Sequence, residues 1–268
     1  MKQAFTILMV FALVAGYASF AAAAPKIEGK PVEYTAGGVT LKGYLAYDEN
    51  VKGTRPGVLV VHEWWGQNEY VRKRARMLAE LGYTALALDM FGEGRLASHP
   101  DDAGKFTSEL MKNFPVAKER FLAALDFLKK QPTVDPDRIA AIGFCFGGGV
   151  VLNMARQGVD LKGVASFHGS LGVVKPDQPT PIKAAVRVYN GADDKFVSAE
   201  AIEALKKEMA DQKVRFKFVD YPGAVHAFTN PEATETGKKF NMPIAYNAAA
   251  DKASWADMQE FFKEIFKQ

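Results

Sequence analysis

The chain has 268 residues, of which 48% are hydrophobic and 24% charged, and its formal net charge at pH 7 is +3. These proportions are those of an ordinary globular protein, and the length suits one domain with a large core. Positive charges are spread along the chain without a dense Lys/Arg run, which argues against nucleic acid as a partner. The sequence leaves the oligomeric state open.

The first 23 residues have the pattern of a secretory signal peptide. A positive start, Met1-Lys2, is followed by an apolar run from Phe5 to Phe20 and by four alanines that end at Ala24. We expect cleavage before Ala24, because small residues form an A-x-A site there. An uncleaved membrane anchor is the alternative, but the apolar run is short for a membrane span. The pattern therefore predicts an exported protein, periplasmic or secreted, that makes no stable membrane insertion after cleavage, with residues 24–268 forming a single domain.

Strand-like and helix-like segments alternate through the rest of the chain. In chain order, the sequence predicts a strand at 39–47, a strand at 57–62, a helix at 71–81, a strand at 83–88, a helix at 116–130, a strand at 138–144, a helix at 147–157, strands at 164–168 and 185–190, a helix at 199–211, a strand at 215–221 and a helix at 249–267. This alternation predicts an α/β fold, a three-layer sandwich with a mainly parallel central sheet and helices on both faces. Segments 91–115 and 229–247 lack periodicity, and we expect them to be loops that shape a pocket at the carboxyl ends of the strands.

The single cysteine of the chain lies in a strand–turn–helix sequence. Gly143-Phe144-Cys145-Phe146-Gly147 matches the G-x-nucleophile-x-G pattern and stands between an apolar strand and an apolar helix. Small residues are needed because the turn is strained and its nucleophile must project. The N-terminus of a helix favours the thiolate of Cys145, and the N–H of Phe146 can donate to an oxyanion. A buried structural cysteine in a glycine-rich turn is the alternative.

An acid and a histidine follow the cysteine in the order that such a site requires. Asp194 lies three residues after Gly191, at the end of the strand predicted at 185–190, and Asp193 is the fallback. His226 follows the strand at 215–221, in a turn from which an imidazole can reach a thiol and an acid together. Cys145, Asp194 and His226 are therefore predicted to be nucleophile, orienting acid and base. The alternatives are solvated turn aspartates and a packed or surface histidine.

These residues resemble the dienelactone hydrolase family, whose members have the α/β-hydrolase fold, from about residue 39 to residue 266. The matching pieces are His62-Glu63-Trp64-Trp65-Gly66, Gly143-Phe144-Cys145-Phe146-Gly147-Gly148, Gly191-Ala192-Asp193-Asp194 and Tyr221-Pro222-Gly223-Ala224-Val225-His226-Ala227-Phe228. The resemblance implies that Cys145 is the nucleophile, His226 the base and Asp194 its partner. It also implies that Glu63 contacts the thiol and helps activate it, and that the N–H of Trp64 is the second oxyanion donor. A Glu63 that only caps the following turn is the alternative.

Two stretches depart from the family. Members that cleave dienelactone hold the substrate carboxylate with one arginine after the fourth strand and another just beyond the histidine. Arg95 is expected to substitute for the first as a substrate-binding residue, whereas Asn230 offers no positive charge in place of the second. Whether dienelactone itself is cleaved is therefore left open.

The sequence thus predicts a hydrolase that cleaves ester, lactone or similar acyl bonds of small molecules through an acyl-enzyme on Cys145, without a cofactor. Cleavage of amides or peptides on the same machinery is one alternative, and a non-catalytic binding protein on the same scaffold is another. A redox sensor is disfavoured because the chain has no resolving cysteine. His62 and Glu63 point to opposite faces of a strand, so no metal site is predicted, and His168 is expected to be packed at a strand end.

Overall fold

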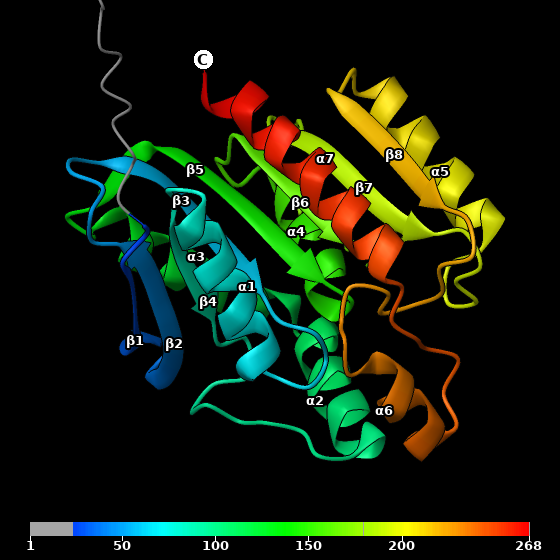
Figure 1. Cartoon of the computed structure of the whole chain (residues 1–268). Coiled ribbons are helices and arrows are strands. Elements are labelled where there is room, and N and C mark those ends of the chain that lie inside the picture. Colours follow the sequence, from blue (N-terminus) through cyan, green and yellow to red (C-terminus); the bar gives the residue numbers. More distant parts are fainter. Residues whose placement is uncertain (1–23, 179, 268) are drawn as a thin grey trace, which may run out of the picture.

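The computed structural model describes residues 24–178 and 180–267, and the predicted signal peptide lies outside them. The strands form one sheet in the order β1-β2-β4-β3-β5-β6-β7-β8 (Figure 1). β1 and β2 form an antiparallel hairpin, β2 pairs antiparallel with β4, and all other pairs are parallel. The strands are β1 (Ile27–Ala36), β2 (Val39–Asp48), β3 (Arg55–Val61), β4 (Thr84–Leu88), β5 (Val134–Phe144), β6 (Gly163–Phe167), β7 (Ala185–Gly191) and β8 (Phe216–Tyr221). The predicted α/β fold with a mainly parallel sheet is confirmed.

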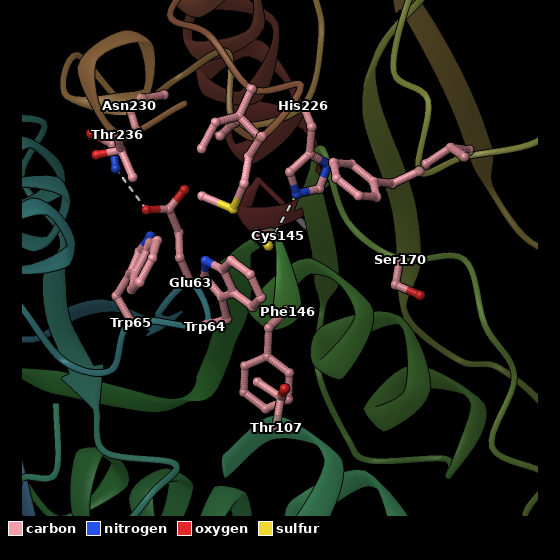
Figure 2. A pocket seen from close by; sticks show the side chains of 16 residues that line it. Glu63, Trp64, Trp65, Thr107, Cys145, Phe146, Ser170, His226, Asn230 and Thr236 are labelled. Carbon is pink, nitrogen blue, oxygen red and sulfur yellow. Dashed lines mark hydrogen bonds between the residues drawn. The ribbon is translucent and has the colours of Figure 1, made fainter. Parts of the chain in front are cut away.

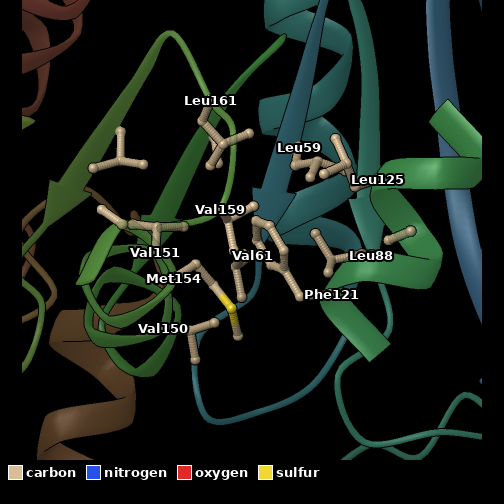
Figure 3. Close-up of a cluster of buried hydrophobic side chains, with 14 of the residues drawn as sticks. Leu59, Val61, Leu88, Phe121, Leu125, Val150, Val151, Met154, Val159 and Leu161 are labelled. Carbon is tan, nitrogen blue, oxygen red and sulfur yellow. The ribbon is translucent and has the colours of Figure 1, made fainter. Parts of the chain in front are cut away.

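Helices cover both faces of this sheet, because the central strands are apolar on both sides. The helices are α1 (Glu69–Glu80), α2 (Pro100–Lys112), α3 (Phe114–Lys129), α4 (Phe146–Arg156), α5 (Ala199–Asp211), α6 (Ala233–Phe240) and α7 (Ala248–Phe266). Leu59 and Val61 of β3 pack with α3 and α4 in one cluster of buried side chains (Figure 3). The alternate residues Val58 and Val60 pack with α1 and α7 on the opposite face. Within the described part of the chain, no helix combines the length and the apolar composition that crossing a bilayer requires.

Three elements were not predicted from the sequence. The edge strand β1 is half exposed along most of its length, so its apolar residues do not form a continuous run. The two segments expected to be loops contain helices α2 and α6, and that prediction was wrong. Each of these helices buries only two residues, Ala103 and Leu110 in α2 and Ala233 and Gly237 in α6. Both helices are nevertheless amphipathic, with their few apolar residues gathered on one face, so a helical period was present in these short segments but was not recognised from the sequence.

Helices α2 and α6 lie beyond the carboxyl ends of the parallel strands, apart from the helices that cover the sheet faces (Figure 1). The ring of His99, the residue before α2, lies 5.3 Å from the ring of Phe240, the last residue of α6. Ligands of open α/β sheets bind at this edge. The two helices therefore enclose the end of the sheet at which the predicted site residues gather.

Candidate active site

Cys145 occupies a tight turn between β5 and α4 and has φ +52° and ψ −116°, which an L-residue rarely adopts. The turn is held against the end of β3, because the N–H of Gly147 donates to the carbonyl of His62 at 3.1 Å. A Cβ on Gly147 would lie 2.4 Å from the carbonyl oxygen of Val61, and one on Gly143 would lie 2.0 Å from that of Gly147. Both positions therefore require glycine, and the thiol projects from the turn between them.

The three residues predicted as nucleophile, base and acid meet in one line of contacts. The Sγ of Cys145 lies 3.1 Å from Nε2 of His226 (Figure 2), and Nδ1 of His226 lies 2.8 Å from Oδ2 of Asp194. The other carboxylate oxygen of Asp194 accepts the N–H of Phe196 at 2.8 Å, which fixes its orientation. Asp194 is buried whereas Asp193 is exposed, so the structure selects Asp194 between the two.

Charge around His226 favours its protonated form. Burial of the ring opposes protonation, but the negative Cys145 thiolate and the Asp194 carboxylate outweigh burial and raise the pKa of His226 to about 10. A histidine placed between a thiolate and a carboxylate can hold the proton taken from the thiol. The arrangement can therefore store the nucleophile as a thiolate–imidazolium pair.

Two backbone N–H groups stand beside the thiol with no acceptor within the described residues. Phe146 is the first residue of α4, so its N–H has no intrahelical partner. Trp64 follows β3, the strand that neighbours β5, and both residues line the same pocket as Cys145 (Figure 2). Their role as oxyanion donors stays a prediction.

Glu63 also reaches this pocket, but its hydrogen bond differs from the expected one. Its Oε2 accepts a hydrogen bond from Nδ2 of Asn230 at 2.7 Å, and within the described residues it makes none to the Cys145 thiol. Burial raises the pKa of Glu63 to about 7, although Asn230, His226 and Arg74 partly offset that effect. Activation of the thiol by Glu63 stays a prediction.

Arg95 does not lie at the site, contrary to its expected role in binding substrate. Its guanidinium donates to the carbonyl of Phe91 and lies 4.9 Å from the centre of the Phe106 ring. These groups line a separate hollow between α2 and α3. The sequence placed Arg95 near the right strand end, but the turn after β4 directs its side chain toward α2.

The other two histidines near the site are packed rather than free. His168 follows β6 and is buried, as expected, and its Nδ1 accepts the N–H of Cys145 while its Nε2 bonds to Oγ1 of Thr229. His62 is fully buried, and its Nε2 accepts the N–H of Met90 at 3.2 Å. Neither residue lines the pocket.

The pocket in front of Cys145 has a volume of about 320 Å³ and mostly apolar walls. Several of its lining residues were not predicted from the sequence, because they come from the unpredicted helices and from loops. These are Thr107 of α2, Ala233 and Thr236 of α6, Ser170, Phe196, Met242 and Ile244. The Phe196 ring lies 4.9 Å from that of His226 and forms part of the pocket rim, where 59% of the residue is exposed.

Comparison with known proteins supports the same assignment. A model of the dienelactone hydrolase family matches residues 41–266. Protein usf of Aquifex pyrophilus is 30% identical over 241 residues, which cover 88% of this chain and 98% of that protein. A solved structure called m3DLH is 38% identical, with a TM-score of 0.84 over 89% of this chain and 98% of its own.

A second solved structure is described as the dienelactone hydrolase-like promiscuous phosphotriesterase P91 from metagenomic libraries. It is 36% identical, with a TM-score of 0.83 over 89% of this chain and 98% of its own. A third solved structure, Est1E from Butyrivibrio proteoclasticus, is 17% identical with a TM-score of 0.60, a likeness that concerns the fold alone.

Proposed function

Since the chain belongs to the dienelactone hydrolase family, whose members hydrolyse ester and lactone bonds, we propose that it is such a hydrolase and works through Cys145, His226 and Asp194. The observation that carries the proposal is the line of contacts from the Cys145 sulfur through both ring nitrogens of His226 to the Asp194 carboxylate. The expected substrates are small molecules, because the pocket holds about 320 Å³.

In the first half of the reaction, the thiol proton passes to Nε2 of His226 and the thiolate attacks the substrate carbonyl carbon. A C–S bond forms, and the carbonyl electron pair moves onto oxygen, where the N–H groups of Phe146 and Trp64 can stabilise it. When that pair returns, the C–O bond breaks, and the leaving alkoxide takes the proton from His226. In the second half, His226 removes a proton from water, and the hydroxide attacks the thioester. The Cys145 thiolate then leaves, and the acid product is released.

The test is hydrolysis of small p-nitrophenyl esters and lactones by purified protein of residues 24–268, beside the variant Cys145→Ala. We expect the variant to lose at least about a hundredfold in kcat/KM. Ser170→Ala is the matched control, because it removes a serine hydroxyl that lines the same pocket and should be dispensable. Retained activity in Cys145→Ala, or loss only in Ser170→Ala, would refute the nucleophile. An anilide in the panel tests the alternative of amide cleavage.

Hydrolysis of phosphotriesters is a second candidate function. It is favoured by the 36% identity to P91 over most of both chains, and by apolar pocket walls that suit an uncharged triester. A p-nitrophenyl dialkyl phosphate added to the same panel tests it. Turnover that disappears in Cys145→Ala would support phosphotriester hydrolysis as a function. No turnover by the wild type above the blank would exclude it.

We also propose that the protein is exported, on the strength of the signal-peptide pattern in residues 1–23. The test is expression of the full-length chain in a bacterium, followed by fractionation and N-terminal sequencing. An exported protein that begins at Ala24 is the expected result. A protein retained in the cytoplasm with residue 1 intact would refute the proposal.

A further inference from the structure

The ionisable side chains of the substrate pocket are all acids or members of the triad. Within the part of the chain that the structure describes, the pocket lining includes no lysine or arginine. Its ionisable residues are Glu63, Cys145 and His226, and the remaining walls are aromatic, aliphatic or neutral polar groups. The one positive charge, on His226, is already shared between Cys145 and Asp194. Among the described residues, a bound substrate therefore finds no free cation in this pocket.

Glu63 adds a buried carboxyl group to the same space. Only 3% of the residue is exposed, one carboxyl oxygen is held by Asn230, and the other points into the pocket (Figure 2). The side-chain amide of Asn230 is fixed against a flip of its oxygen and nitrogen, because the oxygen accepts the N–H of Glu232 at 3.0 Å. The buried guanidinium of Arg74, whose charge also acts on Glu63, binds the carbonyl of Thr229 and the carboxylate of Asp251 instead. Glu63 thus has a neutral partner on one oxygen and open pocket in front of the other.

A substrate that carries its own carboxylate would bring a second negative charge into this space. Removing a carboxylate from water is costly unless a cation or several donors replace the water, and a like charge nearby adds to that cost. Arg95, the cation that the sequence suggested for this task, lies in another hollow. An uncharged ester has no carboxylate to desolvate and is not repelled by Glu63, and the apolar walls favour its burial.

Building on the proposed function, we infer that the enzyme acts on uncharged acyl substrates and rejects those whose acyl part ends in a carboxylate, with Glu63 as the specificity-determining residue. The substrate class of the site is then neutral esters or lactones small enough for the pocket. Glu63 acts as a fixed negative charge beside the bound acyl chain, whatever its part in activating the thiol.

The test compares two p-nitrophenyl esters, the butyrate and the hemisuccinate, which differ mainly by a terminal carboxylate. The Cys145→Ala protein gives the blank for spontaneous hydrolysis. We expect kcat/KM for the butyrate to exceed that for the hemisuccinate by about a hundredfold, and Glu63→Gln to narrow this ratio by about tenfold. Glu232→Gln is the matched control, because it removes a neighbouring exposed charge outside the pocket, and its ratio should stay within about twofold of wild type.

A second measurement needs no variant. The groups that face Glu63 are Asn230, His226, Arg74, Glu232 and Tyr70. The raised pKa of Tyr70 keeps it neutral between pH 6 and pH 8. Burial raises the pKa of Glu63 to about 7, whereas the pKa of His226 is about 10, so between pH 6 and pH 8 Glu63 changes charge and His226 does not. The butyrate to hemisuccinate ratio of the wild type should therefore rise across this range. Hydrolysis of both esters at similar rates, or a ratio that neither Glu63→Gln nor pH changes, would overturn the inference alone. Failure to hydrolyse either ester would instead refute the proposed function.

Discussion

Nδ1 of His168 lies 3.1 Å from the backbone nitrogen of Cys145, so this buried ring accepts a hydrogen bond from the nucleophile turn itself. Its Nε2 lies 2.7 Å from Oγ1 of Thr229, which is 2.6 Å from the hydroxyl of Tyr70. Burial, together with the nearby positive charges of His226 and Arg74, holds the pKa of His168 well below its ordinary value. The ring is therefore neutral, and it links α1 and the segment after His226 to a backbone that is strained at φ +52°. The same N–H of Cys145 also donates to the carbonyl of Phe167 at 3.0 Å, so His168 and β6 hold the nucleophile turn together.

Thr229→Val should destabilise the protein, because it leaves the Nε2–H of His168 and the hydroxyl of Tyr70 without their shared partner. We expect the free energy of unfolding to fall by about 1–3 kcal/mol, the usual result of leaving a buried polar group unsatisfied. Urea denaturation measures this change. Tyr70→Phe is the control, because it removes the bond to Thr229 and a longer one from Nε of Arg74 but leaves Thr229 bonded to His168. A loss in Tyr70→Phe as large as that in Thr229→Val would contradict the role of the Thr229 link.

Asp194→Asn should lower kcat/KM by roughly a hundredfold or more, because the neutral amide no longer stabilises the positive charge of His226. Its single oxygen also cannot accept both the N–H of Phe196 and the Nδ1–H of His226. The adjacent variant Asp193→Asn removes an exposed carboxylate in the same turn and should leave kcat/KM within about twofold of wild type. Steady-state hydrolysis of a p-nitrophenyl ester gives both values. Equal losses in the two variants would point to a general effect of the turn rather than to the contact with His226.

The triad and most of the sheet could be predicted from the sequence, since each leaves a local mark. The G-x-C-x-G turn, the aspartate after Gly191 and the histidine after β8 each stand at the end of an apolar run, and the structure brings all three together. Helices α2 and α6 do carry a helical period of apolar residues, but each buries only two residues, and both segments were expected to be loops. The direction of the Arg95 side chain depends on how the turn after β4 packs against α2, and the bond between Glu63 and Asn230 joins segments far apart in the chain, so no local pattern could reveal either.

Gly147→Ala should lower both activity and stability, because a Cβ there would lie 2.4 Å from the carbonyl oxygen of Val61 and push the nucleophile turn away from β3. Backbone atoms cannot rotate aside as the end of a flexible side chain can. Gly104→Ala is the matched control: Gly104 lies in α2, and a Cβ added there would meet nothing within 4 Å, so alanine should stabilise the helix by about 0.5–1 kcal/mol. Urea denaturation and ester hydrolysis of both variants test this pair. A Gly147→Ala protein with wild-type stability and activity would show that the end of β3 can move away from the added Cβ without loss of stability.

The stability contributed by position 63 should depend on pH in a direction opposite to that of an ordinary ion-paired carboxylate. Burial raises the pKa of Glu63 from 4.5 to about 7, so between these values the folded protein binds a proton that the unfolded chain has released. The free energy of unfolding of wild type relative to Glu63→Gln should therefore fall as pH rises from about 4.5 to about 7 and stay level above it. The total fall is at most about 3 kcal/mol, from the size of the shift. Urea denaturation of both proteins at about pH 5 and pH 8 measures it, and a difference that is constant across this range would mean that the folded protein does not raise the pKa of Glu63.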